Sequence, residues 1–213
     1  ILGLSKAYGL RLGRGWDVPP GILHAPGTLC TYEPQRASDV FSMWQSLIFD
    51  QQVVGWDLLV KDVPDEYKHD LDYIMSLLDW EANIDPNFAD NHFCAPRPIG
   101  SDAEAAERGY QEKWIVYGSP YFSAKELTVH PGRTVSVRDP AAYGAITMQG
   151  YGRFGVHAIS APSMIRFGQM TEDEFFVSVS AAREGVTITN LSSTEPLVIM
   201  KHFNPGNPEM PSR

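Results

Sequence analysis

A histidine and a glutamate near the start of the chain have the residue types and spacing that best suit chemistry. His24 follows the turn Pro19-Pro-Gly21, and Glu33 comes nine residues later. A neutral imidazole is a good ligand for zinc or iron, and a carboxylate beside it can move a proton or orient a substrate. The turn lets the chain fold back, so both side chains can point inward from neighbouring strands of a small barrel. The alternative is that His24 caps a turn and that Glu33 pairs with an arginine.

The elements that must position these side chains are mostly β strands. From Leu4 to about Gln35, short apolar runs alternate with Gly and Pro, which is typical of short strands joined by tight turns. From Lys113 onward, apolar segments recur at intervals of roughly eight to twelve residues, and this cadence predicts an antiparallel sandwich or barrel with one buried face. The predicted strands are KWIVYG, AKELTV, RTVSVR, GAITMQ, RFGVHAI, SMIRFG, EFFVSV, GVTITN and PLVIMKHF.

A helix is predicted between the two strand-rich regions, from Asp62 to about Trp80. Asp62 suits the N-cap, and four apolar residues follow at the spacing of one helix face: Leu71, Ile74, Met75 and Leu78. Between Asp39 and Phe49 either a shorter helix or an apolar strand fits the pattern. Residues 84–111 are interpreted as a linker. The predicted division is therefore 1–36 for strands with the candidate site, 37–111 for the helical segment and linker, 112–203 for a second β domain, and 204–213 for a mobile tail.

Composition limits the classes of function and partner. Lys and Arg number 17 against 26 Asp and Glu, which gives a net charge of -9 and no basic run. Nucleic acid and anionic membranes are therefore not expected as partners. No apolar run approaches the ~18–20 residues that span a bilayer. The two cysteines, Cys30 and Cys94, are too few for a disulfide scaffold and fit a reducing compartment, so we expect a cytoplasmic protein.

The stretch from Pro19 to Asp39 resembles the metal-histidine region of type I phosphomannose isomerases, which are zinc-dependent double cupins. In that family a histidine turn supplies one metal ligand, a glutamate follows nine residues later, and an Ala-Ser-Asp sequence comes shortly afterwards. His24, Glu33 and Ala37-Ser38-Asp39 stand in those places. The resemblance implies zinc or another divalent metal on His24, a catalytic acid–base role for Glu33, and substrate contacts from Ser38 and Asp39.

The fold implied by this resemblance is mostly β, a cupin-type jelly roll in the double-cupin arrangement. Residues 1–36 would be the C-terminal strands of an incomplete first cupin, and one or two helices would lie in the inter-domain segment. Residues 112–203 would form a second cupin-like domain. That domain is expected to bind no metal, because no His-x-His precedes the turn at Gly150 and Arg183 stands where a late histidine ligand would be.

Two departures from the family pattern bear on activity. The family's other metal ligands lie upstream of the histidine turn, and the 23 residues before His24 contain no histidine, glutamine or glutamate. Zinc would therefore depend on ligands from a further upstream segment, because a structural or catalytic zinc site takes three or four protein ligands. Met43 stands where the family carries an arginine, and a methionine cannot stabilise an enediolate charge.

Two functions from different classes follow. The first is a metal-dependent aldose–ketose isomerase acting on a sugar phosphate, similar to mannose-6-phosphate isomerase. The alternative is a non-catalytic β protein that binds a carbohydrate or another small ligand. An iron-dependent oxygenase would need two histidines and a carboxylate on one face, and no such set is found. The expected partner is a sugar or sugar phosphate, together with either a homodimer contact or association with an N-terminal segment absent from this sequence.

Overall fold

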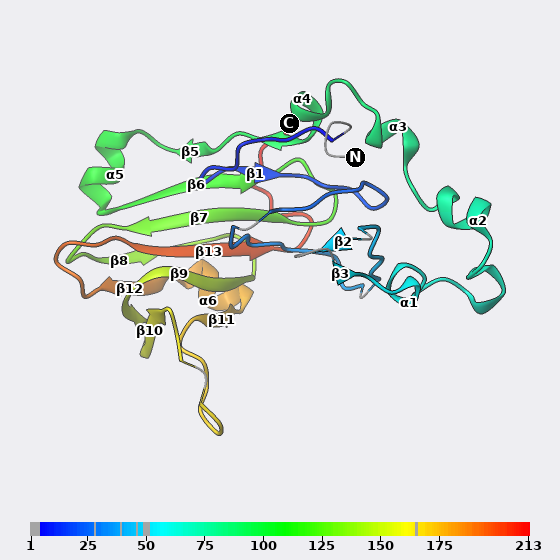
Figure 1. Ribbon diagram of the computed structural model, residues 1–213. Coiled ribbons are helices and arrows are strands. Elements are labelled where there is room, and N and C mark those ends of the chain that lie inside the picture. The colour runs from blue at the N-terminus through cyan, green and yellow to red at the C-terminus, as the bar shows by residue number, and fades with distance from the viewer. Residues whose placement is uncertain (1–4, 28, 39, 46, 49–51, 165) are drawn as a thin grey trace. The chain divides into compact units, whose positions relative to one another are not determined.

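The computed structural model describes residues 5–27, 29–38, 40–45, 47–48, 52–164 and 166–213 (Figure 1). The chain divides into two compact units, residues 18–92 and residues 1–17 together with 93–213. The boundaries between these units differ from the predicted domain boundaries after residues 36 and 111. The start of the chain belongs to the larger unit because β1 (Gly15–Trp16) pairs with β4 (Phe93–Cys94). No helix in the described ranges is both long and apolar enough to cross a membrane.

The larger unit is built on an antiparallel nine-stranded sheet, so the prediction of a mostly β chain with a curled, jelly-roll sheet is confirmed. The strand order is β5-β6-β7-β13-β9-β12-β8, and β10 and β11 also pair with β9 (Figure 1). The strands are β5 (Arg97–Ile99), β6 (Tyr110–Val116), β7 (Ser123–Val129), β8 (Thr134–Val137), β9 (Tyr143–Phe154), β10 (His157–Ala161), β11 (Glu174–Val177), β12 (Val186–Asn190) and β13 (Leu197–Phe203).

Strand β9 is the element that curls the sheet. Its first half pairs with β13 and β11, and its second half pairs with β12 and β10. Gly152 lies in the second half, where a Cβ atom would stand 1.9 Å from the backbone oxygen of Thr189. Only glycine fits there, because that neighbour is backbone and cannot move aside without breaking the strand pair.

The core lies on the inner face of β7 and β13. Because side chains alternate along a strand, Leu127 and Val129 share one face of β7, and they stand opposite Ile199 and Leu197 of β13. All four side chains are fully buried. The apolar alternation of both predicted strands is thus the observed packing pattern.

The predictions for three segments between residues 84 and 179 differ from the structure. Residues 84–111 are not a linker, because they form α4 (Phe88–His92), β4, β5 and α5 (Asp102–Arg108). Ser101 begins α5 through a capping box with Glu104, and Gly109 ends it with a φ of 81°. The described residues of SMIRFG form no strand, and EFFVSV ends as a strand at Val177 because Ser178 caps α6 (Val179–Glu184).

The unit of residues 18–92 carries short elements in place of the predicted long helix. These are β2 (Leu47–Ile48), β3 (Gln52–Val53), α1 (Trp56–Leu59), the 3-10 turn η2 (Asp65–Tyr67), α2 (Leu71–Ser76), α3 (Trp80–Asn83) and α4. The helix divides because the side chains of Asp70 and Asp79 each accept a backbone N–H, from Tyr73 and Ala82, and so begin new helices. Asp62 is not an N-cap, since its carboxylate accepts the backbone N–H of Phe41.

The expectation of strands up to Gln35 is also wrong for the described residues. After β1, residues 17–27 and 29–38 contain no strand. Four prolines in this stretch remove backbone donors that a β ladder would need: Pro19, Pro20, Pro26 and Pro34.

Candidate functional site

The histidine and glutamate predicted from the sequence do not face each other inside a barrel. His24, Glu33 and Ser38 are all exposed, and Asp39 lies outside the described residues. The Nδ1 of His24 donates to the backbone oxygen of Ile22 at 2.9 Å, and Glu33 accepts a hydrogen bond from Thr31. The described structure contains no hydrogen bond between His24 and Glu33. The arrangement expected for them is therefore wrong, and their roles stay predictions.

The donor set around His24 does not fit zinc by itself. Within the described ranges, no group of three or more His, Cys, Asp and Glu side chains could hold a metal ion. One imidazole falls short of the three or four protein ligands of a zinc site. A metal centre at His24 would therefore need donors from outside the residues that the structure describes.

A different set of polar side chains comes together inside the larger unit. Lys125 on β7 and Lys201 on β13 stand directly opposite each other in the strand register, and both are almost fully buried. Two like charges in such a pair repel, so they persist only if anions separate them. Asp139, which follows β8, lies between the two amines. Its Oδ1 accepts from Lys125 Nζ at 2.8 Å and its Oδ2 from Lys201 Nζ at 2.6 Å.

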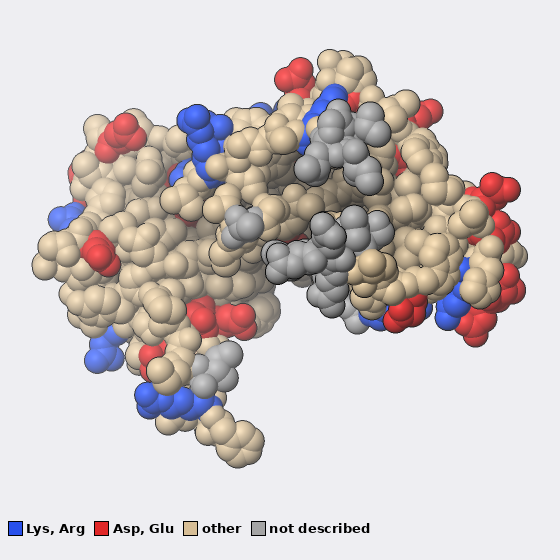
Figure 2. All heavy atoms as spheres, viewed as in Figure 1, with Lys and Arg blue, Asp and Glu red and all other residues tan. Residues whose placement is uncertain are grey.

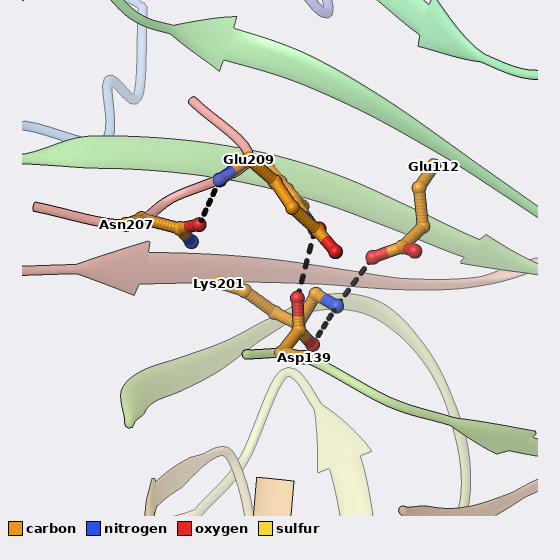
Figure 3. A network of polar contacts seen from close by, with 6 residues as sticks. Glu112, Asp139, Lys201, Asn207 and Glu209 are labelled. Atoms are coloured by element: carbon orange, nitrogen blue, oxygen red, sulfur yellow. Dashed lines mark hydrogen bonds and ion pairs between the residues drawn. The ribbon is translucent and has the colours of Figure 1, made fainter. Parts of the chain in front are cut away.

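Two further carboxylates complete this charged network, which consists of Glu112, Lys125, Asp139, Lys201 and Glu209. Glu112 on β6 pairs with Lys201, and Glu209 pairs with Lys125 at 3.2 Å. Figure 3 shows the amine of Lys201 between the carboxylates of Glu112 and Asp139. The signs alternate along the chain of contacts, with three carboxylates against two amines.

Aromatic rings enclose the two amines. The Nζ of Lys125 lies 4.8 Å from the centre of the Trp114 ring, and that of Lys201 lies 5.3 Å from the Tyr143 ring. Burial by itself lowers the pKa of Lys125, but the Glu112 and Asp139 carboxylates outweigh it, so that the pKa is raised. Burial also raises the pKa of Tyr143, and the same two carboxylates raise it further. Lys125 is therefore an ammonium at neutral pH, suited to hold an anion rather than to act as a nucleophile.

A surface depression of about 230 Å³ reaches the network, lined by Arg138, Asp139, Pro140, Arg183 and Glu209. The two arginines are exposed, and each is held through Nε by a backbone oxygen, of Glu184 for Arg138 and of Pro140 for Arg183. Their terminal guanidinium nitrogens have no hydrogen bond within the described structure. Two anchored guanidinium groups beside a buried ammonium form a place where an anion can be held.

A second depression, of about 570 Å³, lies in the unit of residues 18–92, and its lining lacks cationic side chains that could bind an anion. Its lining includes Glu81, Asp85 and His92, and no lysine or arginine. The carboxylate of Asp85 already accepts from the backbone of Asn87 and from the side chain of Asn91. The Asp85 carboxylate therefore serves the local fold, and the greater volume of this depression does not make it the better candidate.

The acidic excess of the chain is confined to one unit. Residues 18–92 contain 13 of the 26 acidic residues but only 3 of the 17 basic ones, so this unit has a net charge of -10 and the remainder has +1. Figure 2 shows acidic side chains gathered over the surface of the segment that contains α1 to α3. The unit that holds the depression is thus close to neutral, and its own field does not repel a small anion.

The sequence signal for this network is visible once the strand phase is known. Lys125 lies two residues before Leu127, and Lys201 lies two residues after Ile199, so period-two alternation places both lysines on the buried face. Neither lysine is among the site residues predicted from the sequence, although both lie in predicted strands, AKELTV and PLVIMKHF. Asp139 and Glu209 carry no such signal, since both lie outside strands.

Comparisons with known proteins find partial similarity to solved structures. No family model matches the sequence, and no curated protein matches it. Several solved cupin structures are similar to part of this chain. They include a cupin-2 domain protein from Rhodospirillum rubrum (14% identity, TM-score 0.37, 55% of this chain and 75% of that one). Another is an RmlC-like cupin from Ralstonia eutropha (10% identity, TM-score 0.36, 53% of this chain and 64% of that one).

A further similar structure is the complex of SigE with the anti-sigma ChrR from Rhodobacter sphaeroides, at 12% identity and a TM-score of 0.34. The match covers 46% of this chain and 45% of the chain that it matches. Each of these likenesses covers about half of the present sequence. The fold described above rests on the strand pairing of this chain, and none of the three structures is a phosphomannose isomerase.

Proposed function

We propose that this protein binds a small anionic ligand, of the sugar-acid or sugar-phosphate class, in the depression beside the charged network, and that this binding needs no metal. The observation that carries the proposal is that Arg138 and Arg183 line one depression together with Glu209, whose carboxylate contacts the buried Lys125. A volume of about 230 Å³ suits a ligand no larger than a monosaccharide derivative.

The chemistry of these groups selects for charge rather than for a neutral sugar. Guanidinium groups bind planar or tetrahedral anions with two donors each, and Nε of each arginine is already fixed by a backbone oxygen. Fixing Nε reduces the entropy lost on binding, because the side chain is oriented before the ligand arrives. The buried carboxylate of Asp139 can accept from a ligand hydroxyl.

Isothermal titration calorimetry with glucuronate, glucose 6-phosphate and glucose as probes tests the proposal. We expect binding of one or both anions and none of glucose. Arg183→Gln should weaken binding roughly tenfold or more, as expected for the loss of a charged hydrogen bond. Arg153→Gln, at an exposed arginine of β9 outside the depression, should leave binding unchanged. Binding that is equal for glucose and glucuronate, or indifferent to Arg183→Gln, would refute the proposal.

The metal-dependent sugar-phosphate isomerase is the second candidate, and the tautomer of His24 favours it. A backbone oxygen can only accept, so the ring proton lies on Nδ1 and the lone pair on Nε2 points away. Metal-binding histidines are commonly oriented by such a bond. The isomerase would require zinc ligands beyond the described residues and an acid–base role for Glu33.

Metal analysis of the purified protein and an assay of mannose 6-phosphate to fructose 6-phosphate conversion test this candidate. If the protein is this isomerase, we expect stoichiometric zinc in the wild type and its loss in His24→Ala. The control variant His69→Ala, at another exposed histidine of the same unit, should keep the zinc. Protein that contains no metal and shows no conversion would exclude it without affecting the proposed anion binding.

A further inference from the structure

The segment that follows β13, residues 204–213, lies against the charged network although it contains no helix or strand. Asn207 is buried, and its side-chain oxygen accepts the backbone N–H of Glu209 at 3.0 Å (Figure 3). Farther along, the backbone oxygen of Ser212 accepts from Arg97, and Arg213 pairs with Asp17. This C-terminal segment was predicted to be a mobile tail, whereas these contacts attach it to the sheet unit at several points.

Glu209 differs from every other member of the network in its surroundings. Its side chain is 56% exposed, whereas those of Asp139, Lys125 and Lys201 are at most 1% exposed. Its contact with Lys125, at 3.2 Å, is longer than the 2.8 Å contact of Asp139 with the same amine. Charge-assisted hydrogen bonds are strongest at about 2.7–2.9 Å. Glu209 is therefore the carboxylate whose removal from the network costs the least interaction energy.

The charge balance points the same way. Without Glu209 the network holds two amines and two carboxylates, Asp139 and Glu112, and is neutral. Glu209 is thus not needed to neutralise a buried charge, and another carboxylate could replace it without altering the total. The side-chain nitrogen of Asn207 is buried and has no hydrogen-bond partner within the described structure, which leaves a second donor in the same turn.

We infer that Glu209 occupies the place of a ligand carboxylate, so that the ligand is a carboxylic acid of the sugar-acid class, and that it displaces Glu209 from Lys125 on binding. This inference rests on the proposed anion-binding function. The incoming carboxylate accepts from Lys125 where Glu209 did, and Arg138 and Arg183 line the same depression. The C-terminal segment is then a cover that competes with the ligand.

Glu209→Gln tests the inference, because it weakens the internal competitor and leaves the arginines unchanged. Glucuronate should bind to this variant tenfold or more tightly than to the wild type, since the wild-type site is open only in molecules whose Glu209 has left Lys125. Glu195→Gln is the matched control, because it removes the same charge from an exposed position outside the network. Glucose 6-phosphate should gain less than glucuronate from Glu209→Gln.

Amide hydrogen exchange supplies a readout that does not depend on affinity. The backbone N–H groups of Glu209 and Met210 donate to Asn207, so displacement by glucuronate should speed their exchange in the wild type. Wild-type binding that is lost in Arg183→Gln but not improved by Glu209→Gln would overturn this inference alone. Absence of binding in the wild type and in Glu209→Gln would overturn the proposed function with it.

Discussion

Asp139→Asn is the change that most directly tests how the buried amines are stabilised. Asp139 contacts both lysines at 2.8 and 2.6 Å, and its side chain is fully buried. At an effective dielectric constant of about 20, each contact corresponds to roughly 6 kcal/mol of attraction before desolvation is subtracted. Removing one partner of a buried ion pair typically costs about 3–5 kcal/mol, because it leaves an uncompensated charge. Asparagine keeps the shape, so this cost reflects charge and not a cavity.

Urea unfolding followed by tryptophan fluorescence measures the effect, with Trp114 as a reporter beside Lys125. With a slope of about 2 kcal/mol per molar urea, the midpoint should fall by roughly 2 M. Glu107→Gln, at an exposed glutamate of α5, should leave the midpoint unchanged. In a double-mutant cycle, Lys201→Gln should cost less in the Asp139→Asn background than in the wild type. A loss below about 1 kcal/mol for Asp139→Asn would refute the view that Asp139 separates two repelling amines.

Three further predictions concern pH and close packing. Because its folded pKa is raised, Lys125 stabilises the fold below the ordinary value of 10.5, so unfolding midpoints should decline as pH rises through the folded pKa. Burial lowers the pKa of His202, although Glu174 opposes the shift. The neutral imidazole therefore contributes stability that is fully present above pH 6.5 and is lost as the pH falls through the folded pKa. His202→Gln should remove this part of the pH dependence of the unfolding midpoint. Gly152→Ala should destabilise the protein by about 3 kcal/mol in urea unfolding, whereas Gly9→Ala, with open space around it, should be neutral.

Much of the sheet could be predicted from the sequence, because alternation and turn residues act locally. AKELTV, GVTITN and PLVIMKHF coincide with β7, β12 and β13 to within about one or two residues. The prediction of a single helix from Asp62 to Trp80 is wrong for a reason that is also local. Asp70 and Asp79 stand on either side of the apolar stripe from Leu71 to Leu78, and each caps the start of a new helix, which apolar periodicity alone does not predict.

The candidate site could be predicted only in part, since its residues meet through long-range pairing. Lys125 and Lys201 are 76 residues apart in sequence, and only the β7–β13 register places them side by side. Asp139 and Glu209 join them from segments without regular structure, whose paths no periodicity specifies. The likeness around His24 concerns residues of the other unit, because a family motif depends on spacing, whereas the burial of Lys125 and Lys201 depends on which face of a strand they occupy.

The position of β13 between β7 and β9 has a consequence for synthesis on the ribosome. This strand follows all the others in sequence yet lies in the middle of the sheet, so β7 and β9 have unpaired edges until Leu197–Phe203 has emerged. Exposed edges of this kind recruit other chains, and long-range pairing forms slowly. The nascent chain thus stays open to aggregation until that final insertion, which also delivers Lys201 to its carboxylates and closes the interior.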